Sequence, residues 1–227
     1  MQSVILAAGK GTRMGELTKD TPKPMLRVQG KPLLEHHLNF LPDAIDEVIF
    51  VIGYLGEQIR GYFGEKWQGR KIRYVVHEKI DGTAKALISA REVLRGNFLV
   101  TMGDDLYVKK DLERLATFDV GILVHPAEDP TRFGVIETDA NGRLVDIEEK
   151  PKEPKSNLVS TNAFVLDERF FSYDPVRISE AEFGLPQTIL VMSRDYPVEV
   201  VTATAWQPVG KPEDIAVAEK FLEEKGI

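Results

Sequence analysis

Cysteine is absent from this sequence of 227 residues. Disulfide bonds, thiolate nucleophiles and cysteine-ligated zinc are therefore excluded. Long apolar runs are also missing, because no stretch approaches the roughly 18–20 residues that a membrane-spanning helix needs. The N-terminal residues enter an apolar strand pattern directly, without the features of a secretory signal. We expect a cytoplasmic protein with no membrane partner.

Positive charge is in deficit, since 29 lysines and arginines stand against 36 aspartates and glutamates, a formal net charge of −7. A net acidic chain argues against a broad nucleic-acid surface, so no nucleic-acid partner is expected. A site for a phosphorylated ligand must then be local and basic. Hydrophobic residues make up 43% of the chain, enough for a large core. No linker or repeat divides it, and we expect a single domain over residues 1–227.

A short apolar run, Val4–Leu6, is followed at once by the small residues of Ala7–Gly11. The run has the composition of a buried strand, and the small residues let the backbone turn sharply and let a ligand approach closely. Lys10, Arg13 and Lys23 add positive charge to the same loop. Free backbone N–H groups and cations at the end of a buried strand suit a polyphosphate.

The glycine spacing fits neither common phosphate loop. The segment Gly9–Gly15 lacks the Lys-Ser/Thr pair that closes a P-loop, and Met14 occupies the third glycine position of the dinucleotide pattern G-x-G-x-x-G. Spacing alone would be compatible with an ordinary tight turn. The clustered cations and the segment Pro22–Pro24 favour a ligand loop instead.

Strand and helix patterns alternate through the first half of the chain. Strands joined by helices pair in parallel with right-handed crossovers, so we expect an α/β fold with helices on both faces of a sheet. The glycine loop, His77–Thr83 and Gly103–Asp105 then fall at the carboxyl edge of that sheet, where such folds bind ligands. On the first helix, His36 and His37 are expected to pack rather than to act as ligands. The predicted strands are Val4–Ala8, Glu47–Ile52, Lys71–Val76 and Phe98–Met102, and the predicted helices are Lys31–Phe40, Leu55–Phe63 and Ala84–Leu94.

The second half of the chain consists mostly of strands joined by turns. Asn141-Gly142 lies between two strand patterns, Gly134–Glu137 and Leu144–Glu148, which is a strong hairpin signal. We expect the two halves, about residues 1–115 and about residues 116–227, to share one sheet. Further strands are predicted at Val120–Val124, Leu158–Leu166 and Val198–Thr202, and helices at Asp167–Tyr173, Leu185–Arg194 and Pro212–Lys225.

Three linked motifs near the N-terminus carry a resemblance to a known family. Gly9-Lys10-Gly11-Thr12-Arg13-Met14, Pro22-Lys23-Pro24-Met25-Leu26 and Gly30-Lys31-Pro32-Leu33-Leu34-Glu35-His36 resemble the signature of the sugar-1-phosphate nucleotidyltransferases, or nucleotide-sugar pyrophosphorylases. The resemblance covers essentially the whole chain, and we expect no left-handed β-helix domain of the kind that some members append. It implies a Rossmann-like, three-layer αβα fold (GT-A-like) with a mixed, mostly parallel central sheet, in which the first half binds nucleotide and the second half binds sugar phosphate.

The reaction that the resemblance implies joins an NTP to a sugar-1-phosphate and releases pyrophosphate. Because the attacking phosphate oxygen is already an anion, the site must mainly hold two anions together and neutralise their charge. By the resemblance, Arg13 grips the departing phosphates, Lys23 lies between the reacting phosphates, and Asp104 ligates Mg²⁺, with Asp105 as a possible further ligand. The resemblance and the loop positions give the nucleotide-binding candidates as Leu6, Ala8, Gly9, Gly11, Thr12, Arg13, His77, Gly82 and Thr83.

Motifs of the second half resemble the family's sugar-phosphate site. Gly134 lies in a segment similar to Y-G-V, and Glu149 and Lys150 match the first two residues of E-K-P. The segment Thr161-Asn162-Ala163 resembles N-A/T-G, which implies that Asn162 contacts the sugar, although its third position is Ala163 instead of glycine. Trp206 and Gly210 are expected to line the same pocket.

The sequence departs from the family at several positions. Pro208 stands where the family commonly has the aspartate that is its second metal ligand, and Glu182–Gln187 lacks the aspartate of E-Y/F-x-L-T-D. His77 stands where uridylyl and thymidylyl members often carry glutamine. These departures leave the metal geometry, the base and the sugar open.

UTP or dTTP with glucose-1-phosphate or a close relative is the favoured substrate pair. CTP with phosphocholine or a polyol phosphate, and GTP with mannose-1-phosphate, stay open within the same chemistry. A non-catalytic regulatory subunit that binds nucleotide sugars is the alternative class, motivated by Pro208. A metal-dependent glycosyltransferase would leave Gly9–Arg13 and Pro22–Pro24 unexplained. A homo-oligomeric state is possible.

Overall fold

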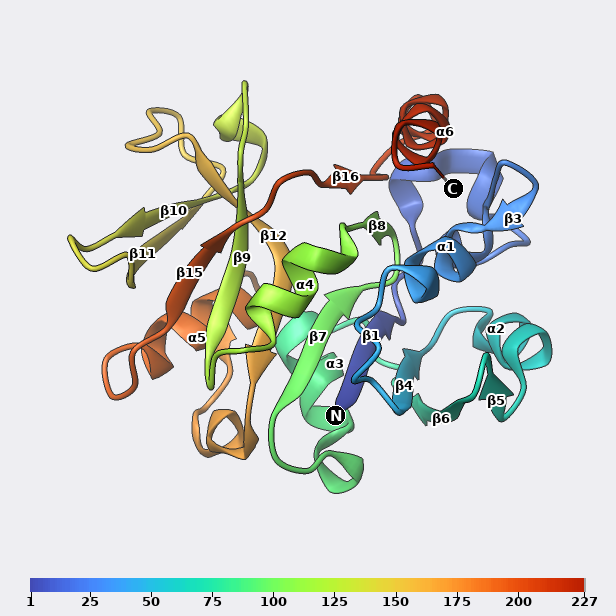
Figure 1. Cartoon of the computed structure of the whole chain (residues 1–227), viewed down its shortest axis with the longest axis horizontal. Helices are drawn as coiled ribbons and strands as arrows, with labels where there is room; N and C mark the ends of the chain where they lie inside the picture. The colour runs from blue at the N-terminus through green and yellow to red at the C-terminus, as the bar shows by residue number, and fades with distance from the viewer. Residues whose placement is uncertain (227) are drawn as a thin grey trace.

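A ten-stranded mixed sheet runs through the computed structural model, which describes residues 1–226 (Figure 1). Its first part is parallel, with the strand order β7-β1-β4-β6. The chain order of these strands reverses at β1, and such a switch point leaves a crevice at the carboxyl ends of the strands. The predicted α/β class is confirmed. These strands are β1 (Gln2–Ala7), β4 (Glu47–Ile52), β6 (Arg70–Val76) and β7 (Phe98–Met102).

The second part of the sheet is largely antiparallel and joins the first through β12, which pairs with β7. The predicted hairpin is present, since β10 pairs with β11 around the turn at Asn141-Gly142. Strand β12 also pairs with β9, and β9 pairs in parallel with β15. The strands of this part are β9 (Gly121–Pro126), β10 (Gly134–Thr138), β11 (Leu144–Glu149), β12 (Leu158–Leu166) and β15 (Glu199–Thr202), while the short β5 (Lys66–Trp67) edges β6.

Helices cover both faces of the sheet, which gives the expected three layers (Figure 1). Since side chains alternate along a strand, Ile5 and Ala7 pack with one helical layer and Val4 and Leu6 with the other. The first layer consists of α1 (Leu33–Asn39), α2 (Gly56–Phe63) and α4 (Lys109–Leu115), and the second of α3 (Thr83–Ser89) and α5 (Leu185–Met192). Within residues 1–226, no helix has both the length and the apolar character to cross a bilayer.

A third core cluster lies beyond the carboxyl ends of the strands, where Figure 1 shows α6 (Asp214–Glu224) close to β3 (Lys31–Pro32). Ala218, Phe221 and Leu222 of α6 pack there with Met14 of the glycine loop and Val209. The C-terminal helix therefore holds the glycine loop in place. Two short ladders flank this cluster, β2 (Arg27–Val28) with β3, and β8 (Asp105–Leu106) with β16 (Gln207–Pro208).

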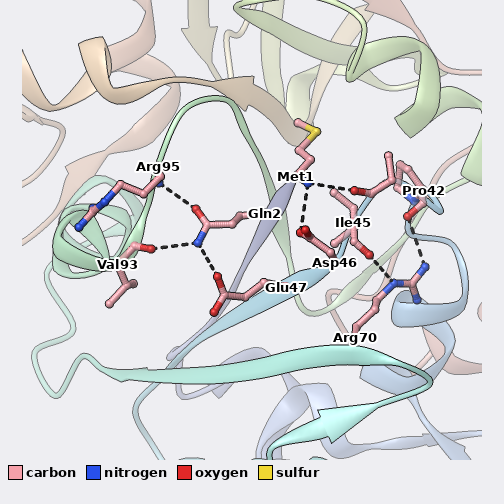
Figure 2. A network of polar contacts seen from close by, with 10 residues as sticks. Met1, Gln2, Pro42, Ile45, Asp46, Glu47, Arg70, Val93 and Arg95 are labelled. Atoms are coloured by element: carbon pink, nitrogen blue, oxygen red, sulfur yellow. Dashed lines mark hydrogen bonds and ion pairs between the residues drawn. The ribbon is translucent and has the colours of Figure 1, made fainter.

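A polar network closes the opposite, amino-terminal edge of the sheet (Figure 2). The Gln2 amide donates to Glu47 Oε2 at 2.7 Å and to the Val93 carbonyl at 3.0 Å, and its oxygen accepts from the Arg95 amide at 2.8 Å. The Arg70 guanidinium donates to the carbonyl oxygens of neighbouring loops. Hydrogen bonds within the chain occupy this edge of the sheet, whereas the candidate loops lie at the carboxyl edge.

Several predicted helices have different bounds or types. The helix predicted over Ala84–Leu94 ends at Ser89, whose hydroxyl donates to the Ala86 carbonyl at 2.6 Å and competes with the helical ladder. The chain continues as a 3₁₀ turn at Arg91–Val93, and Glu168–Ser172 is 3₁₀ instead of the short helix predicted there. Helix α4 was not predicted, because it is too short for its apolar residues to show a clear period.

Candidate active site

Loops from the carboxyl ends of β1, β6 and β7 line one cavity of about 350 Å³, which we call the β1 pocket. Small residues of the glycine loop and of Gly82–Thr83 line it together with larger side chains such as Arg13, Lys23 and Met102. All the nucleotide-binding candidates predicted from the sequence lie here, together with Lys23 and Asp104: Leu6, Ala8, Gly9, Gly11, Thr12, Arg13, His77, Gly82 and Thr83.

Gly11 is required by the shape of the glycine loop. Its φ of 65° lies in the left-handed region, and a Cβ there would stand 2.9 Å from Lys23 Cβ. The Thr18 hydroxyl donates to the Gly11 carbonyl at 3.0 Å and fixes the turn. Since only glycine meets both conditions without strain, the loop can pack directly on Lys23, which lies in a 3₁₀ turn at Lys23–Met25.

The loop after β6 is held from across the molecule. Gly82 has a φ of 100°, and a Cβ there would lie 2.3 Å from the Phe183 carbonyl oxygen. The Phe183 amide donates to the Asp81 carbonyl at 2.9 Å, so the short β14 (Phe183–Gly184) fixes this loop. His77 Nε2 lies 2.9 Å from Asp81 Oδ1 without the geometry of a hydrogen bond, and the His77 side chain is 12% exposed. His77 therefore lies in the pocket wall with a carboxylate behind it.

A second cavity of about 300 Å³, which we call the β12 pocket, lies against the antiparallel part of the sheet. Asn162 enters it from an irregularity of β12, where the pairing with β9 shifts between Ser160 and Ala163. Asn162 has a φ of 57° and Lys150 a φ of 48°. A left-handed backbone conformation is costly for residues other than glycine, and a bulge redirects the side chains near it. In other proteins such strained positions cluster at functional sites, which supports Asn162 and Lys150 as site residues.

Every sugar-phosphate candidate predicted from the sequence lines the β12 pocket: Gly134, Glu149, Lys150, Asn162, Trp206 and Gly210. Lys150 Nζ lies 3.2 Å from Glu149 Oε1. The rings of Phe133 and Trp206 meet edge to face at 5.4 Å between centroids. The pocket thus combines an aromatic corner, a paired lysine and carboxylate, and an amide, which suits a polyol that carries an anion.

Five residues line both pockets and form the border between them: Arg13, Lys23, Met102, Asp104 and Gly210. The Lys23 side chain is 8% exposed and pairs with Asp104, whose side chain is 31% exposed. Arg13 has no ion-pair partner among residues 1–226. The border therefore carries two cations, of which one is free to meet an anion.

The adjacent carboxylates Asp104 and Asp105 have opposite environments. Asp105 is buried, and Trp206 Nε1 donates to its Oδ2 at 3.3 Å. Burial, with the neighbouring charge of Asp104, raises the pKa of the Asp105 carboxyl. Asp104 reaches both pockets from the same turn and is partly exposed. Asp104 is therefore the more exposed carboxylate and reaches both pockets, while Asp105 lines only the β12 pocket and accepts a hydrogen bond from Trp206.

A divalent metal fits this site only with help from a phosphorylated ligand. Within residues 1–226, no group of three or more His, Cys, Asp or Glu side chains could hold an ion. Pro208 lines the β12 pocket opposite Asp105 but offers no side-chain donor. Magnesium commonly takes one or two carboxylates and completes its shell with phosphates and water. Asp104 can supply the protein's part of such a shell.

The segment from Trp206 to Asp214 is fastened to the border. The Val209 amide donates to the Asp104 carbonyl at 3.2 Å. Asp214 Oδ2 accepts from the amides of Gly210 and Lys211, at 2.7 and 2.9 Å. Gly210 is thus held against both pockets, with its own amide already used.

Some wall residues were not among the sequence candidates. Lys79, Ile80 and Glu182 line the β1 pocket, and Arg132, Ser160, Pro186 and Asp214 line the β12 pocket. Arg132 directly precedes the segment that suggested Gly134, and a neighbouring cation could have been included on that ground. Glu182 reaches the β1 pocket only because β14 packs on Gly82, which no local pattern encodes.

The fold and the two adjoining pockets define an α/β protein with a basic pocket at a strand switch point beside a second, polar pocket. The family model for nucleotidyl transferases matches residues 2–225, and the chain belongs to this family. It is 32% identical to the UTP–glucose-1-phosphate uridylyltransferase AglF of Haloferax volcanii, over 99% of this chain and 98% of that protein.

The chain is also 33% identical to the bifunctional protein GlmU of Methanocaldococcus jannaschii, over 99% of its own length. It spans about half of the GlmU relatives that it matches, 55% in this case. A solved Bacillus anthracis structure, assigned as a glucose-1-phosphate thymidylyltransferase and bound to sucrose, has 25% identity and a TM-score of 0.87. That match covers 97% of this chain and 95% of the other, and it confirms the predicted nucleotidyltransferase fold.

Proposed function

We propose that the protein transfers a nucleotidyl group from an NTP to a sugar-1-phosphate, with release of pyrophosphate. The observation that carries this proposal is the border itself, since Arg13, Lys23 and Asp104 line both pockets. An NTP in the β1 pocket and a sugar phosphate in the β12 pocket would place their phosphates against these three side chains.

The reaction needs no strong base. An oxygen of the sugar phosphate forms a bond to the α-phosphorus, the bond from that phosphorus to the bridging oxygen of the β-phosphate breaks, and its electron pair leaves with pyrophosphate. No net proton transfer is required, so positioning and charge neutralisation supply the catalysis. Arg13, which lacks an internal partner, would hold the leaving phosphates, and Lys23 would lie between the two reacting anions.

We infer that Asp104 is the protein ligand of a divalent cation, for which Mg²⁺ is the candidate. A bound cation would neutralise charge on the phosphate oxygens of the NTP. Asp104 would have to exchange its contact with Lys23 for the cation, and the same exchange would release Lys23 toward the phosphates. Both carboxylate and lysine are therefore arranged for a ligand that brings negative charge and a metal together.

UTP or dTTP is the proposed nucleotide, and glucose-1-phosphate or a close relative is the proposed acceptor. The names of AglF and of the Bacillus anthracis protein support these choices. CTP with phosphocholine or a polyol phosphate, and GTP with mannose-1-phosphate, use the same border and remain the alternatives. Nucleoside triphosphates and sugar phosphates are cytoplasmic metabolites, and we propose that the protein acts there.

A matrix of UTP, dTTP, CTP, GTP and ATP against a panel of sugar-1-phosphates tests the proposal, with pyrophosphate release as the signal and EDTA as the control for the metal. We expect turnover with one or two pairs and its loss on chelation. Pro208, which removes a family metal ligand, favours a second candidate, a regulatory subunit that binds nucleotide sugars without turnover. Binding without pyrophosphate release for every pair would select that candidate.

A further inference from the structure

The turn Gly103–Asp105 carries the carboxylate of the border, and beside the ladder of β8 with β16 three further contacts fix its backbone. The Gly103 amide donates to the Leu6 carbonyl at 3.0 Å, and the Asp104 carbonyl accepts from the Val209 amide at 3.2 Å. The third contact comes from a side chain, since His37 Nδ1 lies 2.9 Å from the Asp105 carbonyl oxygen. The His37 contact is therefore the one that a substitution can remove while the residues of the turn stay the same.

The protonation of His37 follows from its neighbours. A carbonyl oxygen can only accept, so Nδ1 carries the proton and donates it to Asp105. Nε2 then accepts from the Thr101 hydroxyl, which lies 2.9 Å away. Burial lowers the pKa of His37 to about 4, so the ring is neutral at pH 7. The Tyr107 ring packs against it edge to face at 5.4 Å between centroids, which leaves one orientation for the imidazole.

Helix α1, which carries His37, is also tied to the other partner of the border ion pair. The Leu33 amide at the start of α1 donates to the Leu26 carbonyl at 2.9 Å, directly after the 3₁₀ turn that contains Lys23. Lys23 and Asp104 are 81 residues apart in the sequence. The helix between their two loops thus holds the lysine turn at one end and the carboxylate turn through His37.

We propose that His37 is a positioning residue, which holds the Asp104 turn at the distance from Lys23 that the reaction and its metal require. This inference rests on the proposed function. His37 touches neither pocket, so it acts through Asp105 and not on a substrate. A shift of the turn on the order of 1 Å is enough to cost a large share of the rate in a reaction that depends on positioning.

The neighbouring His36 provides a matched control on the same helix. It is also buried, and its Nε2 lies 2.8 Å from the Val28 carbonyl oxygen, away from both pockets. Loss of either imidazole removes buried hydrogen bonds and lowers the stability of the fold. Only the loss of the His37 side chain is expected to displace the Asp104 turn.

Substitutions at His37 can separate its two hydrogen bonds. Asparagine places an amide N–H near the position of Nδ1, and glutamine extends to the position of Nε2. We expect H37Q and H37L to lower kcat about tenfold or more, with each KM within about twofold of the wild type. H37N should stay within about threefold of the wild type, as should T101V, which removes only the contact to Nε2. H36L should keep kcat while its Tm falls.

The proposal is overturned if H37Q keeps kcat within about threefold of the wild type per folded molecule, or if H37N is as impaired as H37Q. Should H37L fail to fold, the comparison of H37Q with H37N decides, because both retain a polar amide of similar size. A purely structural role would lower the Tm of every His37 and His36 variant and leave kcat of the folded fraction unchanged.

A second readout does not depend on turnover. Mn²⁺ binding in the presence of inorganic pyrophosphate can be followed by water-proton relaxation. We expect H37Q and H37L to weaken Mn²⁺ binding about fivefold or more, and H37N and H36L to leave it unchanged. Equal affinity in H37Q and the wild type would contradict the proposed role. If the wild type turns over no substrate pair, the proposed function fails, while these affinities still decide the role of His37.

Discussion

The two pockets are built by different means, although they meet at one border. The β1 pocket is shaped by loops that follow parallel strands, with glycines at Gly11 and Gly82 in the left-handed region. The β12 pocket is shaped by side chains of an antiparallel region, where the left-handed residues are Lys150 and Asn162. One pocket presents the backbone closely, and the other presents individual functional groups.

This difference indicates which part of the molecule sets the reaction and which part sets its substrate. Backbone N–H groups and fixed cations recognise phosphates in any nucleotide. Side chains such as Glu149 and Asn162 recognise particular hydroxyl groups, because an unmatched polar group in a pocket is costly. A change at the border should therefore affect both substrates, whereas a change in one pocket should affect only the substrate bound there.

The largest effect is expected from Lys23→Ala at the border. Removal of this buried ammonium leaves Asp104 without its partner and the two reacting phosphates without a charge between them. We expect kcat to fall by roughly 10³-fold, the range found when a preorganised charge is lost, and the fold to remain intact by circular dichroism. Pyrophosphate release measures the rate.

Lys10→Ala is the matched control, because Lys10 belongs to the same loop but lines neither pocket. Its rate should stay close to that of the wild type. Activity of the Lys23→Ala protein within about threefold of the wild type would refute the assigned role of this lysine.

Gly82→Ala should act on the nucleotide alone. The new methyl group would lie 2.3 Å from the Phe183 carbonyl oxygen at a φ of 100°, so the loop has to move. We expect KM for the NTP to rise roughly tenfold, while KM for the sugar phosphate changes little. Gly96→Ala is the control, since Gly96 also has a positive φ, 59°, but has open space around it. An equal rise of both KM values would show that the pockets are not independent.

Glu149→Gln should act on the acceptor alone. The carboxylate lines the β12 pocket and lies beside Gly134, so the exchange removes an acceptor for sugar hydroxyl groups and the partner charge of Lys150. We expect KM for the sugar phosphate to rise roughly fivefold with KM for the NTP unchanged. Glu148→Gln, on the exposed neighbour that lines neither pocket, is the control. If only KM for the NTP changes, the assignment of Glu149 to the sugar phosphate is wrong.

Local patterns predicted the sheet well. Strands β4, β7 and β12 have the predicted bounds, because continuous β-branched and apolar runs leave little ambiguity. Two residues of the border, Arg13 and Lys23, could be predicted as well, since Gly9–Arg13 and Pro22–Pro24 are short, contiguous motifs that lie near each other in the sequence. The fold then brought Asp104 to them, as the parallel order of strands required.

Long-range contacts account for what the sequence could not predict. His37 was expected to be a packing residue, and it is buried, but its polar partners Thr101 and Asp105 are 64 and 68 residues away. Glu182 enters the β1 pocket through the packing of β14 on Gly82. Such contacts depend on how whole elements meet, which periodicity along one element does not record.

The smallest effect is expected from Trp206→Phe, which keeps a ring in the β12 pocket and removes one N–H. The indole Nε1 donates to Asp105 Oδ2 at 3.3 Å, so the ring is fixed to the residue that follows Asp104. Without this contact the aromatic corner with Phe133 loses its orientation but retains most of its packing. We expect KM for the sugar phosphate to rise about two- to threefold, with KM for the NTP and Tm nearly unchanged.

Phe133→Leu is the complementary change, because it removes the partner ring and leaves the indole bonded to Asp105. If Trp206→Phe instead lowers kcat about tenfold with both KM values constant, the indole acts through the Asp104 turn, as His37 does. The border would then extend into the aromatic corner, and the division between a pocket that sets the reaction and a pocket that sets the substrate would not hold there.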